Sequence, residues 1–236
     1  MTNSERAYHH GNLRRALLDA AWELLPQGID AITLRAVARL AGVSHAAPQH
    51  HFADRAALLD AFTVEVIEQL TVVLREAWGE REGMNPVRRF ADLGRAYVEY
   101  AQAQPAAFAL MHTVMVQPAA LAERNTVQDA ARRAFAVLVE AVQECQEAGL
   151  FPPEHTLRIA LTGWATAYGL ATLAAQGFSR IGGGDGGPNT VEEAFMALAH
   201  GLLVRLPDDP VGELAAASGD SILPFFDQWS ERSARA

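Results

Sequence analysis

The sequence predicts an all-α protein, and three observations support this fold class. Apolar residues recur at steps of three and four along most of the chain, which is the period of one helix face. No segment alternates apolar and polar residues over a useful length, as a half-buried strand would. Segments that contain proline or glycine separate the helical stretches. We therefore expect short helices at the N-terminus followed by longer ones.

Three short helices are expected in the first quarter of the chain. The first covers residues 12–25 and stops at the Pro-Gln-Gly sequence that follows. Thr33 is placed to cap the second helix, and Gly42 ends it. Ser44 is placed to cap a third helix over residues 45–51.

Longer helices follow. Asp54 can cap a fourth helix with one continuous apolar stripe. The residues of that stripe are Leu59, Phe62, Val66, Leu70, Val73 and Ala77. Further helices are expected at 86–103, 105–116, 120–148, 154–177 and 190–206, before a loosely held tail.

Composition and charge limit the classes of protein that fit. With 236 residues, 50% hydrophobic and 20% charged, the chain is ordinary for a packed soluble protein. Residues 1–15 lack the apolar core of a signal peptide and Cys145 is the single cysteine, so we expect a cytoplasmic protein. The longest uncharged helical stretch, 159–175, is short and weakly apolar, so we expect no membrane span.

The two short helices joined by Ala41-Gly42-Val43-Ser44 have the pattern of a helix-turn-helix. Gly42 can adopt the positive φ of a tight turn, and Val43 is free to point into the core. The exposed second helix is then left to enter the major groove of DNA. Residues 1–60 carry no net formal charge, so the whole excess of −9 lies beyond them, and residues 34–53 contain no acid. This segment is where we expect DNA to bind.

The stretch from residue 11 to 62 resembles the tetracycline-repressor (TetR) family of bacterial transcription regulators. The matching residues are Leu17, Ala20, Ala21, Gly28, Thr33, Val37, Ala38, Ala41, Gly42, Val43, Ser44, His51, Phe52, Arg55, Leu58 and Leu59. The resemblance implies a homodimeric regulator, usually a repressor, that binds an inverted-repeat operator and responds to a small-molecule effector. It predicts a helix-turn-helix DNA-binding domain in 1–60, a helical effector-binding and dimerisation domain in 61–206 and a tail in 207–236.

Two details of the resemblance concern smaller groups of residues. The Tyr-His-His-Gly-Asn-Leu sequence at 8–13 and Trp164 are similar to the branch with a Trp-His-Gly signature, although Tyr168 stands where that signature has histidine. Pro48-Gln49 also stands where the family usually has Leu-Tyr, with the tyrosine on a DNA phosphate. Because Pro48 removes a helical hydrogen bond, we expect a loosened first turn in the recognition helix, with Gln49 free to contact a phosphate or adenine.

The residues expected to line the DNA are Thr33, Arg35, Ser44, His45, Gln49, His50 and Arg55. We assign phosphates to Ser44, His50 and Arg55, and base edges to His45 and Gln49. An arginine in the first turn of a helix opposes the helix dipole, so an external phosphate explains Arg55 better. A role as helix caps, without any contact to DNA, would also explain why Thr33 and Ser44 stand at these positions. His51, beside a phenylalanine, is expected to be partly buried.

An effector pocket is expected between two helices. The residues concerned are Phe108, Met111, His112 and Met115 on one helix face, with Trp164 and Tyr168 one turn apart on another helix. Such a set is equally typical of plain core. Polar groups on His112, Thr113 and Tyr168 favour a pocket for a neutral or cationic, flat or greasy ligand.

Dimerisation is expected to use the helices at 154–177 and 190–206. A stripe of small residues allows close approach of helices, and a leucine face follows it. The stripe consists of Gly163, Ala167, Ala171 and Ala174, and the leucine face of Leu198, Leu202 and Leu206. The alternative is that these residues belong to the core of one chain. A two-fold dimer would hold the recognition helices about 34–36 Å apart.

Other function classes fit the sequence less well. Acidic neighbours raise the thiol pKa of Cys145, and the glycine-rich segment 182–187 lies between helices rather than after a strand, so we expect no catalysis. We expect no cofactor and no metal site, because His9 and His10 have no further ligand at a fitting spacing. A helical protein-interaction module without DNA binding remains the alternative, and a DNA gel shift would separate the two.

Overall fold

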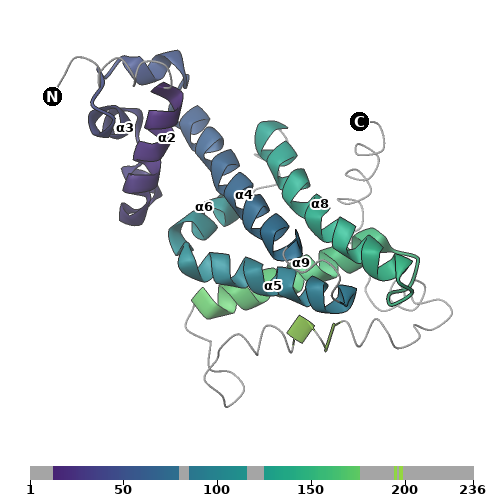
Figure 1. Ribbon diagram of the computed structural model, residues 1–236. Helices are drawn as coiled ribbons and strands as arrows, with labels where there is room; N and C mark the ends of the chain where they lie inside the picture. The colour runs from purple at the N-terminus through teal and green to yellow at the C-terminus, as the bar shows by residue number, and fades with distance from the viewer. Residues whose placement is uncertain (1–12, 80–84, 116–124, 176–193, 196, 199–236) are drawn as a thin grey trace, which may run out of the picture.

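The computed structural model describes residues 13–79, 85–115, 125–175, 194–195 and 197–198 (Figure 1). Every regular element within these ranges is a helix, which confirms the all-α prediction. The elements are α2 Leu13–Leu24, η2 Leu25–Gln27, η3 Ile29–Ala31, α3 Leu34–Leu40, η4 Ala47–His50, α4 Arg55–Gly79, α5 Pro86–Ala103, α6 Pro105–Met115, α8 Asn125–Glu147 and α9 Thr156–Ala175, where η marks a 3-10 helix. Of the helix expected at 190–206, only 194, 195, 197 and 198 lie within the described residues, and these are helical.

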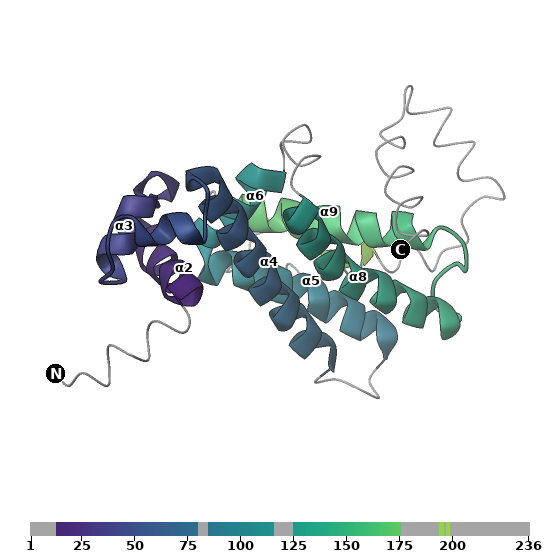
Figure 2. The same cartoon turned by 90° about the horizontal axis from the view of Figure 1, so that it is seen from above.

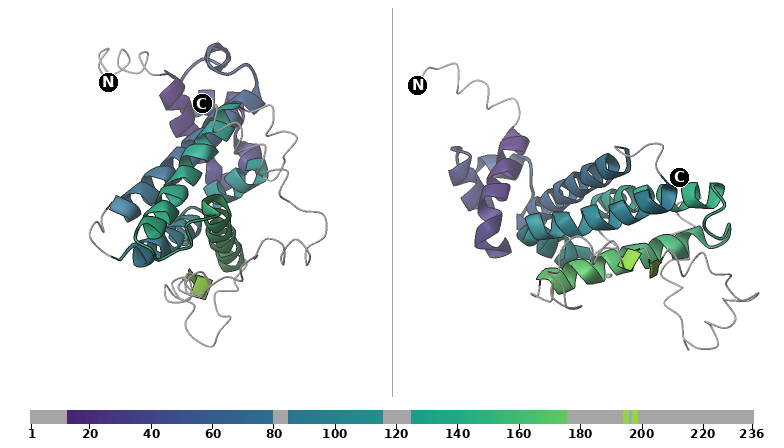
Figure 3. Two further views of the ribbon diagram at one scale, coloured as in Figure 1. Left: turned by 90° about the vertical axis from the view of Figure 1, so that its right-hand side faces the viewer. Right: turned by 60° about the horizontal axis from the view of Figure 1, so that its bottom comes forward.

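The helices form a small and a large group that α4 connects. Figures 1 and 2 show α2 and α3 at one end of the molecule and α5, α6, α8 and α9 at the other. In Figure 3, α4 runs from the first group into the second, and it contacts α2, α5, α6 and α8. The expected boundary near residue 60 therefore falls inside α4, which is part of both groups.

Local sequence signals explain the helix-turn-helix group. Leu17 and Leu24 on the apolar face of α2 are buried as predicted. The Oγ1 of Thr33 accepts a hydrogen bond from the Ala36 N–H at 3.1 Å, which confirms the predicted cap of α3. The apolar residues on either side of this cap, Ile32 and Val37, are both fully buried.

The long helix α4 starts where the sequence predicts but buries a broader face. The Ala57 N–H donates to Asp54 Oδ1 at 2.8 Å, so the predicted cap is present. The buried residues are Leu58, Phe62, Thr63, Val66, Ile67, Leu70 and Leu74. Leu59 and Val73 of the predicted stripe are only half-buried. All six residues of the predicted stripe are buried or pack against the core, and the buried face is broader than the stripe because α5 and α8 both pack along α4.

Close approach of α5 and α9 forms the core of the larger group. Phe90 is fully buried, with ring centroids 5.4 Å from Phe151 and 5.6 Å from Phe195. A Cβ at Gly163 would lie 2.9 Å from Phe90 Cζ, and one at Gly94 would lie 2.1 Å from Phe195 Cε2. Only glycine leaves room for these two rings.

The predicted small-residue stripe of α9 is part of this core. Gly163, Ala167 and Ala171 are buried within the chain, so they match the core alternative rather than the expected dimer contact. The physical reason is that the stripe accommodates the Phe90 ring of α5. Leu198 also packs against the core, while Leu202 and Leu206 lie outside the described residues. Among the helices described, none is both long and apolar enough to cross a membrane.

Candidate functional site

The turn between α3 and the segment that follows has the predicted geometry. Gly42 has φ +68°, and the Val43 N–H donates to the Ala38 carbonyl at 3.0 Å, which closes the end of α3. Val43 is half-buried and packs against the core. A glycine is needed at residue 42 because side chains with a Cβ disfavour this φ.

The predicted recognition helix, 45–51, is shorter and tighter than an α-helix. Its only regular part is η4, in which no side chain caps the N-terminus, so the predicted Ser44 cap is wrong. Pro48 lacks the N–H that would bond to the Ser44 carbonyl, and this carbonyl accepts from the Ala47 N–H at 3.0 Å instead. The loosened first turn that Pro48 predicts therefore takes the form of a 3-10 turn.

This segment and α3 present polar side chains to solvent. The exposed residues are Arg35, Arg39, Ser44, His45, Gln49 and His50, and Thr33 beside them is half-buried. In the part of the chain that the structure describes, no acid pairs with Arg35 or Arg39. Sequence reasoning missed Arg39, although it lies in the acid-free run 34–53. His51 is exposed rather than partly buried, because the turn buries Phe52 and directs His51 outward.

Arg55 has partners inside the helix-turn-helix group. Its Nε donates to the Ile32 carbonyl at 2.8 Å, and its Nη2 donates to the Ile29 carbonyl at 2.7 Å. A third contact, at 3.3 Å, joins Nη2 to the carboxylate of Asp30, whose side chain is 100% exposed. The carbonyls of Ile29, which begins η3, and of Ile32, which follows it, thus offset the unfavourable position of an arginine in the first turn of α4.

The residues expected to bind an effector come together as an aromatic cluster between α6 and α9. The His112 and Tyr168 rings stack with centroids 4.9 Å apart and an interplanar angle of 8°. Tyr168 also lies 6.0 Å from Phe108 and 5.9 Å from Trp164. Thr113 does not join them: it is exposed, and its hydroxyl donates to the Ala109 carbonyl of its own helix. Met115 ends α6, and its side chain lies outside the described part of the structure.

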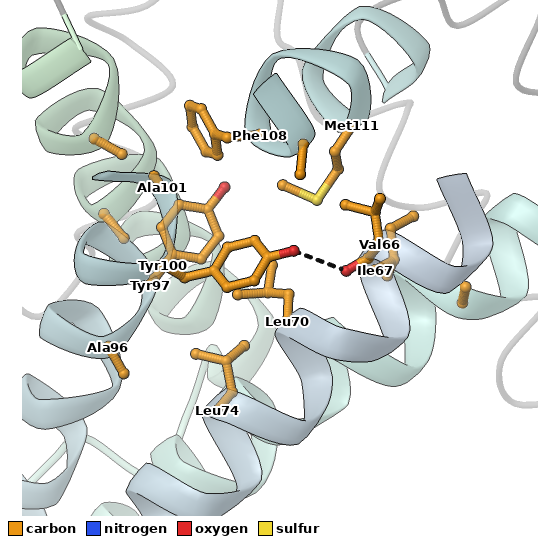
Figure 4. Packing of buried hydrophobic residues seen from close by; sticks show 14 of the residues in the cluster. Val66, Ile67, Leu70, Leu74, Ala96, Tyr97, Tyr100, Ala101, Phe108 and Met111 are labelled. Carbon is orange, nitrogen blue, oxygen red and sulfur yellow. Dashed lines mark hydrogen bonds between the residues drawn. The ribbon is translucent and has the colours of Figure 1, made fainter. Parts of the chain in front are cut away.

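Two tyrosines of α5 complete this cluster and were not predicted. Tyr97 meets Phe108 edge to face at 5.9 Å, and Figure 4 shows Tyr100 beside Met111. The Tyr100 hydroxyl donates to the Val66 carbonyl of α4 at 3.3 Å. Burial raises the pKa of both phenols, that of Tyr100 to about 12, so both remain protonated near neutral pH. The helical period of α5 was the only sequence signal for their burial.

The remaining expectations concern catalysis and metals. Burial, with a further contribution from Glu144, raises the pKa of Cys145 to about 12, so its thiol remains protonated near neutral pH. Within the described ranges, no three His, Cys, Asp or Glu side chains gather as a metal site. His9 and His10 lie outside those ranges.

Comparison with known proteins gives two family matches. Residues 17–62 match the family described as bacterial regulatory proteins, tetR family. Residues 90–202 match the tetracyclin repressor-like C-terminal domain. These matches give no support to the Trp-His-Gly branch that the sequence suggested. A search of curated proteins found no match.

Several solved structures share the fold. A Rhodococcus sp. RHA1 protein of unknown function is 41% identical, with a TM-score of 0.72, covering 83% of this chain and 98% of that one. A putative tetR family transcription regulator from Shewanella sp. PV-4 is 19% identical, with a TM-score of 0.62, covering 81% and 98%. The fatty acid degradation regulator FadR from Bacillus halodurans is 16% identical, with a TM-score of 0.63, covering 80% and 99%.

Proposed function

Since the chain belongs to the TetR family of transcriptional regulators, we propose that it acts in the cytoplasm as a homodimeric repressor released from DNA by a small molecule. The observation that carries the DNA-binding part is the exposed, acid-free surface of the helix-turn-helix. Regulation through an effector and a dimer is typical of the family. The proposal includes no catalytic step.

The DNA surface consists of exposed donors around the α3 turn. We assign phosphates to Ser44 and His50 and base edges to His45 and Gln49, with Arg35 beside them. Thr33 and Arg55, also expected to line the DNA, are half-buried. Gln49 is exposed on the short η4 helix and His45 on the turn just before it, which suits a shallow approach to base edges.

A dimer would place two such surfaces on one DNA duplex. We assign the contact to α9 and to the helical residues 194, 195, 197 and 198, on faces other than the Gly163 stripe. The large side chains of Leu157 and Leu173 on α9 are 46% and 43% exposed, and since they lie on different sides of the helix, each offers an apolar side chain to a contact on its own side.

Selection of DNA by the purified protein tests this function. We expect the protein to enrich inverted repeats from a random duplex pool, with half-sites about 10–10.5 base pairs apart or a multiple of that. Substitution of Gln49 by alanine should relax the preferred sequence within each half-site. If no sequence is enriched, the helical protein-interaction module becomes the better description.

Release from DNA is assigned to the aromatic cluster. A ligand seated between α6 and α9 would displace Tyr100, which bonds to α4, and α6, which contacts both α4 and η2. Either displacement changes the position of the helix-turn-helix group relative to the large group. No Asp, Glu, Lys or Arg side chain joins the aromatic contacts described, so we propose a neutral or cationic planar ligand.

The cluster makes a separate prediction about release. With an inducer found by screening planar compounds for displacement of selected DNA, Phe108→Ala and Trp164→Ala should each raise the half-release concentration about tenfold or more, because each removes a stacking surface. The measurement is a DNA-release titration by fluorescence anisotropy. Val72→Ala, an exposed change on α4, is the control. Folded variants that release DNA at the parent concentration would place the pocket elsewhere.

A further inference from the structure

A single side chain joins the two ends of the helix-turn-helix segment. Arg55 is the first residue of α4, and the two carbonyls that it binds, Ile29 and Ile32, lie just before α3. Residues 33–54 between them contain α3, the Gly42 turn and η4. The Arg55 contact therefore closes a loop that holds the whole DNA-reading segment.

The geometry of this contact suits a guanidinium and no other side chain. The adjacent Nε and Nη2 donors each reach a different carbonyl, at 2.8 and 2.7 Å. A lysine has a single nitrogen on a flexible stem and lacks this rigid fork. Ile32 is fully buried, so its carbonyl needs a donor from the protein, and Arg55 supplies one.

The Asp30 contact adds little to this arrangement. Its carboxylate is fully exposed, and ion pairs between exposed groups are screened by solvent. The carbonyl contacts are therefore the part that fixes the direction of α4 relative to α3. A phosphate bound at the same guanidinium would compete with these contacts for the Nε and Nη2 donors.

We infer that Arg55 is a positioning residue, which sets how well the protein distinguishes its operator from other DNA. This inference rests on the proposed function. The Arg55 contacts with the two carbonyls hold the segment that carries Ser44, His45 and Gln49 in a fixed orientation relative to α4. Hydrogen bonds to base edges require such a fixed orientation. Contacts with phosphates tolerate small rotations, because they carry no sequence information.

The test compares Arg55→Lys with the parent on two DNA probes. One probe is the highest-affinity duplex that the parent selects from a random pool, and the other is a random-sequence duplex of the same length. We expect Arg55→Lys to bind the selected duplex about tenfold more weakly, from the loss of a charge-assisted hydrogen bond. Its affinity for the random duplex and its salt slope should stay unchanged, because the positive charge remains.

Three further variants distinguish positioning from phosphate binding. Asp30→Asn should bind both probes with the parent's affinity, because the contacts that hold Arg55 in place are made with backbone carbonyls. Arg35→Gln should weaken binding to both probes and lower the salt slope by about 2 per dimer. Arg133→Gln, a charge-matched change on α8, should alter neither. Hydrogen exchange of the Ala36 and Val37 amides, which both donate to Thr33, should be faster in folded Arg55→Lys than in the parent.

Two results would overturn the inference. One is an Arg55→Lys protein with the parent's ratio of selected to random affinity and the parent's hydrogen exchange. The other is a Lys variant that loses affinity for both probes together, as Arg35→Gln should. A parent that selects no sequence would instead refute the proposed function.

Discussion

Raising the salt concentration from about 50 to about 200 mM should weaken binding to the selected operator by a factor of about 10³ or more. Each phosphate that the protein neutralises releases counterions from the DNA, and a dimer is expected to contact about 6–10 phosphates. The chain as a whole carries a net charge of −9, so attraction to DNA must come from the acid-free segment 34–53. Added salt screens that local attraction directly.

Fluorescence anisotropy titrations at four or five salt concentrations measure this dependence. The slope of log affinity against log salt counts the phosphates contacted, at about 0.9 per phosphate. Arg133→Gln should keep the parent slope, since its ion pair with Glu68 lies on the distant α4–α8 surface. A slope near zero for the parent would contradict a phosphate-contacting surface on α3 and η4.

Replacement of Phe90 by alanine should lower the free energy of unfolding by about 3–5 kcal/mol. The ring is fully buried and makes edge contacts with Phe151 and Phe195. It also fills the space that Gly163 leaves open on α9, so its loss creates a cavity between two helices. The surrounding helices cannot close that cavity without shifting α9.

Urea unfolding at one fixed protein concentration measures the change, because a dimer's stability depends on concentration. Val72→Ala is the control: its side chain is 54% exposed, so the expected change is within about 0.5 kcal/mol. A loss below about 1 kcal/mol for Phe90→Ala would show that this aromatic core is not as described.

Helix boundaries were predictable where a local signal sets them. The helix expected at 86–103 is α5, because the Asn85 side chain accepts from the Val87 N–H at 2.9 Å and Pro86 occupies the first turn. The Gly42 turn and the Thr33 cap are also local. The loosened first turn at Pro48 was also predictable, because it follows from the single N–H that proline lacks.

Features that depend on distant residues were not predictable in the same way. Arg55 bonds to carbonyls 23 and 26 residues earlier in the chain, so its role depends on a turn that sequence spacing does not fix. The Gly163 stripe predicts close packing but not which helix approaches, and the structure brings Phe90 there. Tyr100 reaches α4 only because α5 packs across it. The spacing of apolar residues predicts which face of a helix is buried, but only the tertiary structure shows which other helix packs against that face.

The unbroken course of α4 bears on how regulators of this kind can be rebuilt. Its 25 residues span about 37 Å, with Trp22 of α2 against Phe62 near one end and Tyr100 of α5 against Val66 one turn later. A chimera joined near residue 60 would separate Trp22 of α2 from its partner Phe62 and pair mismatched surfaces on one helix. A change of operator specificity is therefore better made by exchanging exposed side chains within 44–50. A transplanted DNA-binding domain would have to include α4 and the residues that pack against it.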